Sequence, residues 1–146
     1  MFLLYGILIA AVVWDFRSFR IPNVLILLGV VTGIAYGMWQ DDTWYYSFLE
    51  GCILLLVLYP FYAIGAFGGG DVKLLAVIGI FVGLEQGVNV VVLSLAVGAV
   101  CSVFKILYTL FLTKRLSIKN LYIHFSLPIM VGTFLVHFGG ISWITF

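Results

Sequence analysis

Residues 51–84 read GCILLLVLYPFYAIGAFGGGDVKLLAVIGIFVGL. Two apolar runs in this stretch flank a glycine-rich break, and Asp71 and Lys73 are its only charged residues. Apolar runs without a polar face predict helices that are surrounded by lipid or by other helices. We therefore expect one helix over 47–66, a second over 72–84, and a structured turn between them.

The composition of the whole chain agrees with a lipid environment. Of the 146 residues, 64% are hydrophobic and 9% are charged, whereas soluble domains are about a quarter charged. The chain is therefore expected to be an integral membrane protein. Its net charge of +1 offers no basic surface for nucleic acid. Cys52 and Cys101 form no CxxC motif, so we interpret them as packing residues and expect no metal site.

Charges, prolines and glycines divide the sequence into six apolar segments. These predict a single all-α domain over 1–146 with six transmembrane helices, near 1–19, 23–40, 47–66, 72–84, 87–112 and 124–146. The first segment lacks a basic leader region and a cleavage site, so we expect it to be retained as a span. Segment 72–84 would reach only about 20 Å, less than the roughly 30 Å of hydrocarbon. It is therefore expected to span poorly or to be shielded by its neighbours.

The distribution of charge predicts an orientation. With six alternating spans, all basic residues fall at or near one side, which the positive-inside rule makes cytoplasmic. Both termini are then extracytoplasmic, in a multi-pass protein of the inner or cytoplasmic membrane. The acidic Asp41, Asp42, Glu50 and Glu85 map to the outer side, and Asp15 and Asp71 remain on the cytoplasmic side. The basic residues are Arg17, Arg20, Lys73, Lys105, Lys114, Arg115 and Lys119.

The first motif is WDFRSFRIPN, residues 14–23, at the predicted end of the first helix. Ile21-Pro22 disfavours continuation of the helix, and Asn23 is a suitable N-cap for the next one. The motif therefore predicts a tight turn beside Asp15. Taken alone, Asp15 is better explained as a helix-end residue. Arg17 and Arg20 are likewise better explained as side chains that reach lipid phosphates.

The second motif is GAFGGGDVKLLA, residues 65–76. Its glycines permit close backbone approach, which suits a hinge or a bed for an extended peptide. Taken alone, Asp71 is equally well explained as the N-cap of the following helix. The glycines match neither the dinucleotide-binding fingerprint nor the P-loop pattern.

Together, the two motifs resemble those of the type IV prepilin peptidases, which are aspartic proteases with a GxGD sequence. Gly68-Gly69-Gly70-Asp71 corresponds to that sequence, and Asp15, Arg17, Arg20 and Ile21-Pro22-Asn23 correspond to the family's other motif. HFSLPIMVGTF, residues 124–134, is similar to its proline-containing segment. The resemblance implies catalytic roles for Asp15 and Asp71, without a cofactor. Gly68, Gly69, Gly70 and Lys73 become candidate substrate-binding residues.

The resemblance also implies the substrate, a prepilin with a short cytoplasmic leader that is cut just before an apolar helix, typically after a glycine. Larger family members carry a cytoplasmic insertion associated with N-methylation, whereas this chain has the compact turn 15–22. It therefore resembles the short, Tad-type or archaeal-like members, and methyltransferase activity is not supported. A homo-oligomer and association with the pilus assembly machinery are both compatible with the resemblance.

Two carboxylates suffice for peptide hydrolysis when one takes a proton from water and the other, protonated, polarises the scissile carbonyl. Neighbouring carboxylates do not both ionise easily, so we expect a shared proton. His124 and His137 are too isolated for a metal site, and no serine lies in a nucleophile motif. Alternative functions are a small proton-coupled transporter or channel, because membrane carboxylates also relay protons, and a non-enzymatic subunit of a secretion or pilus complex.

Overall fold

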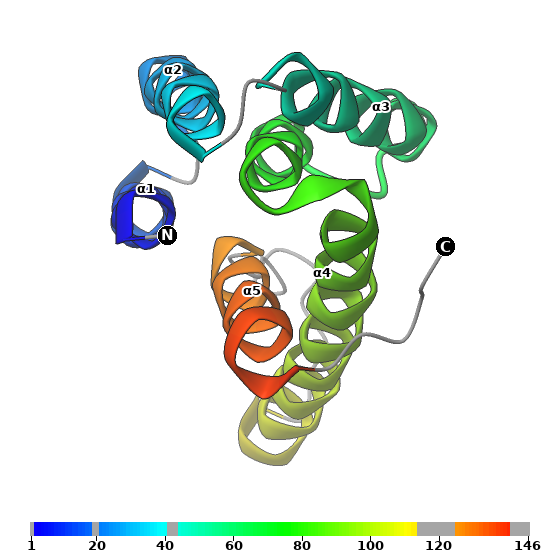
Figure 1. Ribbon diagram of the computed structural model, residues 1–146. Helices are drawn as coiled ribbons and strands as arrows, with labels where there is room; N and C mark the ends of the chain where they lie inside the picture. The colour runs from blue at the N-terminus through cyan, green and yellow to red at the C-terminus, as the bar shows by residue number, and fades with distance from the viewer. Residues whose placement is uncertain (1, 19–20, 41–43, 114–124, 141–146) are drawn as a thin grey trace.

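The computed structural model describes residues 2–18, 21–40, 44–113 and 125–140, and this part of the chain is helical throughout its regular structure (Figure 1). The helices are α1 (Phe2–Ser18), α2 (Asn23–Gln40), α3 (Trp44–Ala63), α4 (Gly69–Thr113) and α5 (Ser126–Gly139). The all-α prediction is confirmed for these residues. The predictions about Arg20, Asp41, Asp42, Lys114, Arg115, Lys119 and His124 concern residues outside these ranges.

A sharp bend divides α4 at Gly83, which has φ 86° and ψ 168°. This backbone region is essentially restricted to glycine, because a Cβ makes it strained. An ideal Cβ on Gly87 would lie 3.4 Å from the Cα of Gly79. Residues this far apart along a straight helix are separated by about 12 Å. The chain therefore folds back at Gly83, close to the predicted break between segments 72–84 and 87–112.

The first arm of α4, residues 69–82, is the centre of the molecule. It lies among α2, α3 and α5 in Figure 1, and α4 packs against each of these helices. Every residue from Leu74 to Phe81 is buried. A helix that is apolar on all sides is stable in such a position because its neighbours cover each face. The prediction that the short segment is shielded by its neighbours is thus confirmed.

The outer surface of the helices is apolar. Leu56 on α3 is 72% exposed and Phe104 on the second arm of α4 is 70% exposed, and many other large hydrophobic side chains are similarly uncovered. A soluble monomer does not expose apolar surface on this scale. Two helical stretches, Trp44–Ala63 and Gly69–Tyr108, are also long and apolar enough to cross a membrane, although the second contains the bend. These features identify a membrane protein.

Candidate active site

Asp15 lies near the C-terminal end of α1 and is one of the few polar side chains in the described core. It is 9% exposed, whereas its neighbours Trp14 and Phe16 are both about half exposed. Its Oδ2 accepts a hydrogen bond of 2.6 Å from the hydroxyl of Ser126, the first residue of α5. The helix thus turns the carboxylate inward, toward α5. Arg17, two residues later, is exposed.

A hydrogen-bonded turn at the C-terminal end of α3 positions the glycine motif. Gly65 adopts φ 77°, its N–H donates to the carbonyl of Tyr62, and the N–H of Ala66 donates to the carbonyl of Phe61. This is the Schellman arrangement that commonly ends helices. It stops α3 and directs the chain toward Gly68 and the start of α4.

Asp71 is the third residue of α4, because the helix begins at Gly69. The interpretation of Asp71 as the N-cap is therefore wrong. The carboxylate reaches back instead and accepts a hydrogen bond from the backbone N–H of Gly68, which is the reciprocal half of a capping box. A carboxylate in the first turn also interacts favourably with the helix dipole. The local capping interactions therefore explain why Asp71 lies in the first turn of α4. They do not show whether the carboxylate has a further function.

One open pocket of about 360 Å³ brings the two motifs together. It contains all of the predicted site residues, and it has a volume within the range of small-ligand pockets. The Asp15 and Asp71 carboxylates are close enough for their charges to repel each other. The lining residues are Asp15, Ile21, Asn23, Gly68, Gly69, Gly70, Asp71 and Lys73. Geometry therefore permits a carboxylate pair to act on one bound group, and the catalytic role itself stays a prediction.

Lys73 lines this pocket but is bonded to another helix. Its Nζ donates a 2.9 Å hydrogen bond to Oδ1 of Asn23, the first residue of α2. The carbonyl of Pro22 accepts the first helical hydrogen bonds, from the N–H groups of Leu25 and Ile26. Pro22 is therefore the N-cap of α2, and the prediction that Asn23 has this role is wrong. The Lys73–Asn23 bond joins α4 to α2 at the edge of the pocket.

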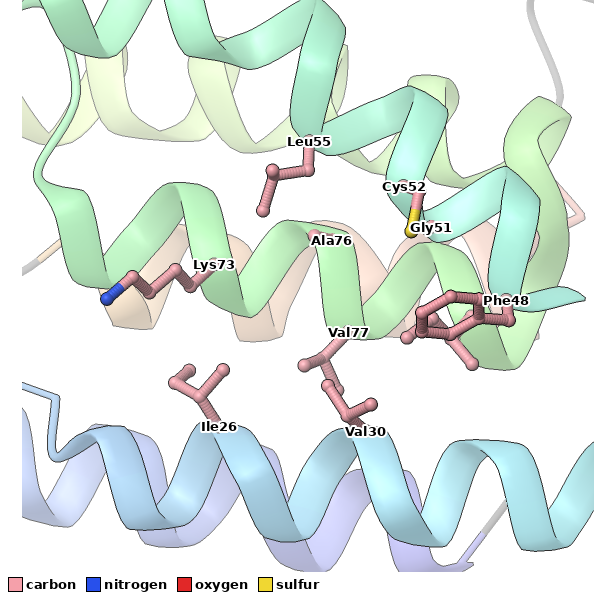
Figure 2. Close-up of a pocket in the computed structure, with 10 residues that line it drawn as sticks. Ile26, Val30, Phe48, Gly51, Cys52, Leu55, Lys73, Ala76 and Val77 are labelled. Carbon is pink, nitrogen blue, oxygen red and sulfur yellow. The ribbon is translucent and has the colours of Figure 1, made fainter.

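A second pocket, of about 110 Å³, lies between α2, α3 and the first arm of α4 (Figure 2). Its lining is apolar apart from Lys73, which lines both pockets. In Figure 2, Lys73 lies at one end and Phe48 at the other, with Val30 and Val77 facing each other between them. We call this the apolar pocket. Its lining residues are Ile26, Val30, Phe48, Gly51, Cys52, Leu55, Lys73, Ala76, Val77 and Ile80.

Ser126 is the site residue that sequence reasoning missed. It lies in the segment 124–134 that the resemblance singled out, but that resemblance emphasised the proline. The available signal was a polar residue in an apolar segment, because a buried hydroxyl needs a hydrogen-bond partner. The structure also adds Asn23 and Ile21 to the pocket. Within the described ranges, no group of three or more His, Cys, Asp and Glu side chains could hold a metal ion.

Comparison with known proteins yields one family and one curated relative. The model of the type IV leader peptidase family matches residues 2–103. The chain is also 32% identical over 144 residues to the prepilin leader peptidase/N-methyltransferase of Bacillus subtilis (strain 168). The alignment covers 97% of this chain and 56% of that relative, so the chain spans little more than half its length. No solved structure matches the chain.

Proposed function

Because the chain belongs to the type IV leader peptidase family, we propose that it is a membrane aspartic endopeptidase that removes the leader from prepilin-like precursors. One observation carries the proposal: Asp15 and Asp71, which are 56 positions apart in the sequence, line the same pocket. The family match supports the type of reaction, and the shared pocket supports the assignment of Asp15 and Asp71 as the residues that perform it.

In the proposed mechanism, the two carboxylates share one proton. The ionised member takes a proton from a water molecule, and the water oxygen attacks the scissile carbonyl. The protonated member donates its proton to the carbonyl oxygen, which gives a tetrahedral diol intermediate. The carboxyl that received the proton from water then passes it to the leaving nitrogen, the C–N bond breaks, and the other carboxylate takes a proton back from the diol, which restores the shared proton. The pair titrates as a unit, so acid and base are not assigned to individual residues. No metal or cofactor is required for this sequence of steps.

The substrate proposal follows from the chemistry of the pocket surroundings. The predicted cytoplasmic side is basic except for the two aspartates. We therefore do not expect electrostatic attraction to bind a basic leader. We assign recognition to extended backbone beside Gly68–Gly70 and to the apolar helix that follows the cut. The apolar pocket is a suitable place for a side chain of that helix, because Lys73 lines it and the pocket of the aspartates.

The proposed topology is a single domain over 1–146 with six crossings, formed by α1, α2, α3, the two arms of α4, and α5. Both termini are extracytoplasmic, and cleavage occurs at the cytoplasmic face of the inner or cytoplasmic membrane. The bend at Gly83 supports the division of α4 into two crossings. Reporter fusions at the two termini test the orientation, and a cytoplasmic reporter signal from either would contradict it.

We further propose peptidase activity without methylation, because the compact turn between α1 and α2 leaves no insertion there. The name of the Bacillus subtilis relative includes an N-methyltransferase activity, but that protein is considerably longer than this chain. Mass measurement of the mature product decides the matter, since methylation adds a methyl group to its new N-terminus.

The deciding experiment exchanges each carboxylate for the isosteric amide. We expect Asp15→Asn and Asp71→Asn each to abolish cleavage of a co-expressed prepilin, because the pair needs one proton-accepting and one proton-donating carboxyl. Glu85→Gln is the matched control, since Glu85 lines neither pocket, and it should cleave normally. Membrane insertion and folding are verified for each variant. Near-normal cleavage by either aspartate variant would refute the assignment of the carboxylate pair.

A further inference from the structure

The first turn of α5 places a fully buried hydroxyl against Asp15. Ser126 has 0% exposure, and its Oγ lies 2.6 Å from Oδ2 of Asp15. This separation falls in the range of about 2.5–2.7 Å that is typical of a hydroxyl bonded to a carboxylate. The Asp15 carboxylate also lies at the N-terminal end of α5, where the helix dipole favours negative charge.

The position of Ser126 is fixed by packing around the start of α5. The ring of Phe125 packs edge-on against Phe67 with ring centroids 5.4 Å apart, and the carbonyl of Phe125 accepts the first helical bond from Ile129. Phe67 directly precedes Gly68, so the same ring pair joins the loop before Asp71 to the residue before Ser126. Pro128 is buried in the first turn, where proline is tolerated. The two carboxylates are thus held relative to each other partly through this contact.

We propose that Ser126 is a positioning residue of the peptidase, whose hydroxyl holds the Asp15 carboxylate in one orientation toward the pocket shared with Asp71. This inference rests on the proposed function. Ser126 does not line the pocket, so it acts through Asp15 and does not touch the substrate. Because the hydroxyl holds one carboxylate oxygen of Asp15, the carboxylate cannot rotate freely. Misplacement of a reacting group lowers the rate of the chemical step.

Ser126→Ala removes this hydroxyl with little change in volume. We expect kcat to fall about 10- to 100-fold, as for loss of a hydrogen bond to a charged group, with KM within about twofold of the original value. Ser126→Thr keeps a hydroxyl and should be clearly more active than Ser126→Ala. The assay uses purified enzyme in detergent micelles with a purified prepilin that the unaltered enzyme cleaves. Thermal unfolding is recorded for every variant.

Ser94→Ala is the matched control. Ser94 is also fully buried, and its hydroxyl donates at 2.6 Å to the Val90 carbonyl of its own helix. An ideal Cβ on Gly132 would lie 2.6 Å from this hydroxyl oxygen, so Ser94 also faces α5. The control should keep kcat within about twofold, since its hydrogen bond does not involve a carboxylate.

Three results would overturn the inference. These are an unchanged kcat in Ser126→Ala, an equal fall in kcat in Ser94→Ala, and a Ser126→Thr variant no more active than Ser126→Ala. The asparagine variants of the two aspartates separate this failure from failure of the proposed function. If they are inactive while Ser126→Ala is fully active, the carboxylate pair stands and the role of Ser126 does not.

Discussion

Single side chains in the pocket divide into those proposed for chemistry and those that hold helices together. Lys73 belongs to the second kind, because its ammonium donates to Asn23 of α2. We expect Lys73→Met to lower kcat/KM about 3- to 10-fold without abolishing cleavage, since a hydrogen bond of this type contributes about 1 kcal/mol. Kinetics with a purified prepilin measure the change. Lys105→Met, outside both pockets, is the control. Complete loss of cleavage would instead give Lys73 a part in the chemistry.

At this scale, sequence reasoning selects residues that lie within recognisable motifs. Asp15 and Asp71 were selected together from charge distribution and motif, and the structure brings them to one pocket. Ser126 was missed because no local sequence pattern indicates that its hydroxyl bonds to Asp15, which is 111 positions away. The N-cap interpretation of Asp71 was wrong because glycines placed the helix start two residues earlier than the carboxylate. Spacing therefore identifies candidates, whereas long-range contacts assign what each one touches.

At the scale of helices, the bend in α4 is the feature on which the arrangement depends. The sequence predicts a break between segments 72–84 and 87–112, and the structure has the bend at Gly83. The shift arises because charge and glycine content indicate an interruption without specifying which glycine adopts the unusual backbone angles. Without the bend, the second arm would extend away from the first arm, whereas the bend brings Gly87 back against Gly79.

Gly83→Ala tests the importance of this bend. We expect the variant to be destabilised by about 1–3 kcal/mol, because a Cβ is strained at φ 86° and would also lie 3.2 Å from the Glu50 carboxylate. Thermal unfolding in detergent measures the effect. Gly6→Ala in α1 is the matched control, since nothing lies within 4 Å of its added Cβ, and alanine is the better helix former. If Gly83→Ala and Gly6→Ala were equally stable, alanine would be accommodated at the bend without strain, and the prediction would be wrong.

For the whole molecule, the all-helical membrane architecture was predictable because composition alone excludes a water-soluble fold. The packing of helices against one another was not, since runs that are apolar on every side carry no face preference. Side-chain packing between the helices determines which of them lies at the centre. The short first arm of α4 has that position, and its neighbours surround it. The same packing leaves the apolar pocket beside the carboxylates, a feature that no motif specified.

Substrate recognition is the last property that belongs to the whole molecule, and two opposite changes test it. Phenylalanine at position 52 would occupy the apolar pocket, so we expect Cys52→Phe to raise KM about 3- to 10-fold, in line with helix packing energies in lipid. Cys101→Phe is the matched control, because Cys101 is also an exposed cysteine but lines neither pocket.

The complementary change is made in the substrate, by replacing the basic residues of its leader with glutamine. Cleavage by the unaltered enzyme should persist, because the side proposed to be cytoplasmic is basic and offers a positively charged leader no attractive partner beyond the two aspartates. If the neutral leader is left uncut while its membrane targeting is normal, charge governs recognition. If Cys52→Phe and Cys101→Phe raise KM equally, the apolar pocket is not where the substrate helix binds.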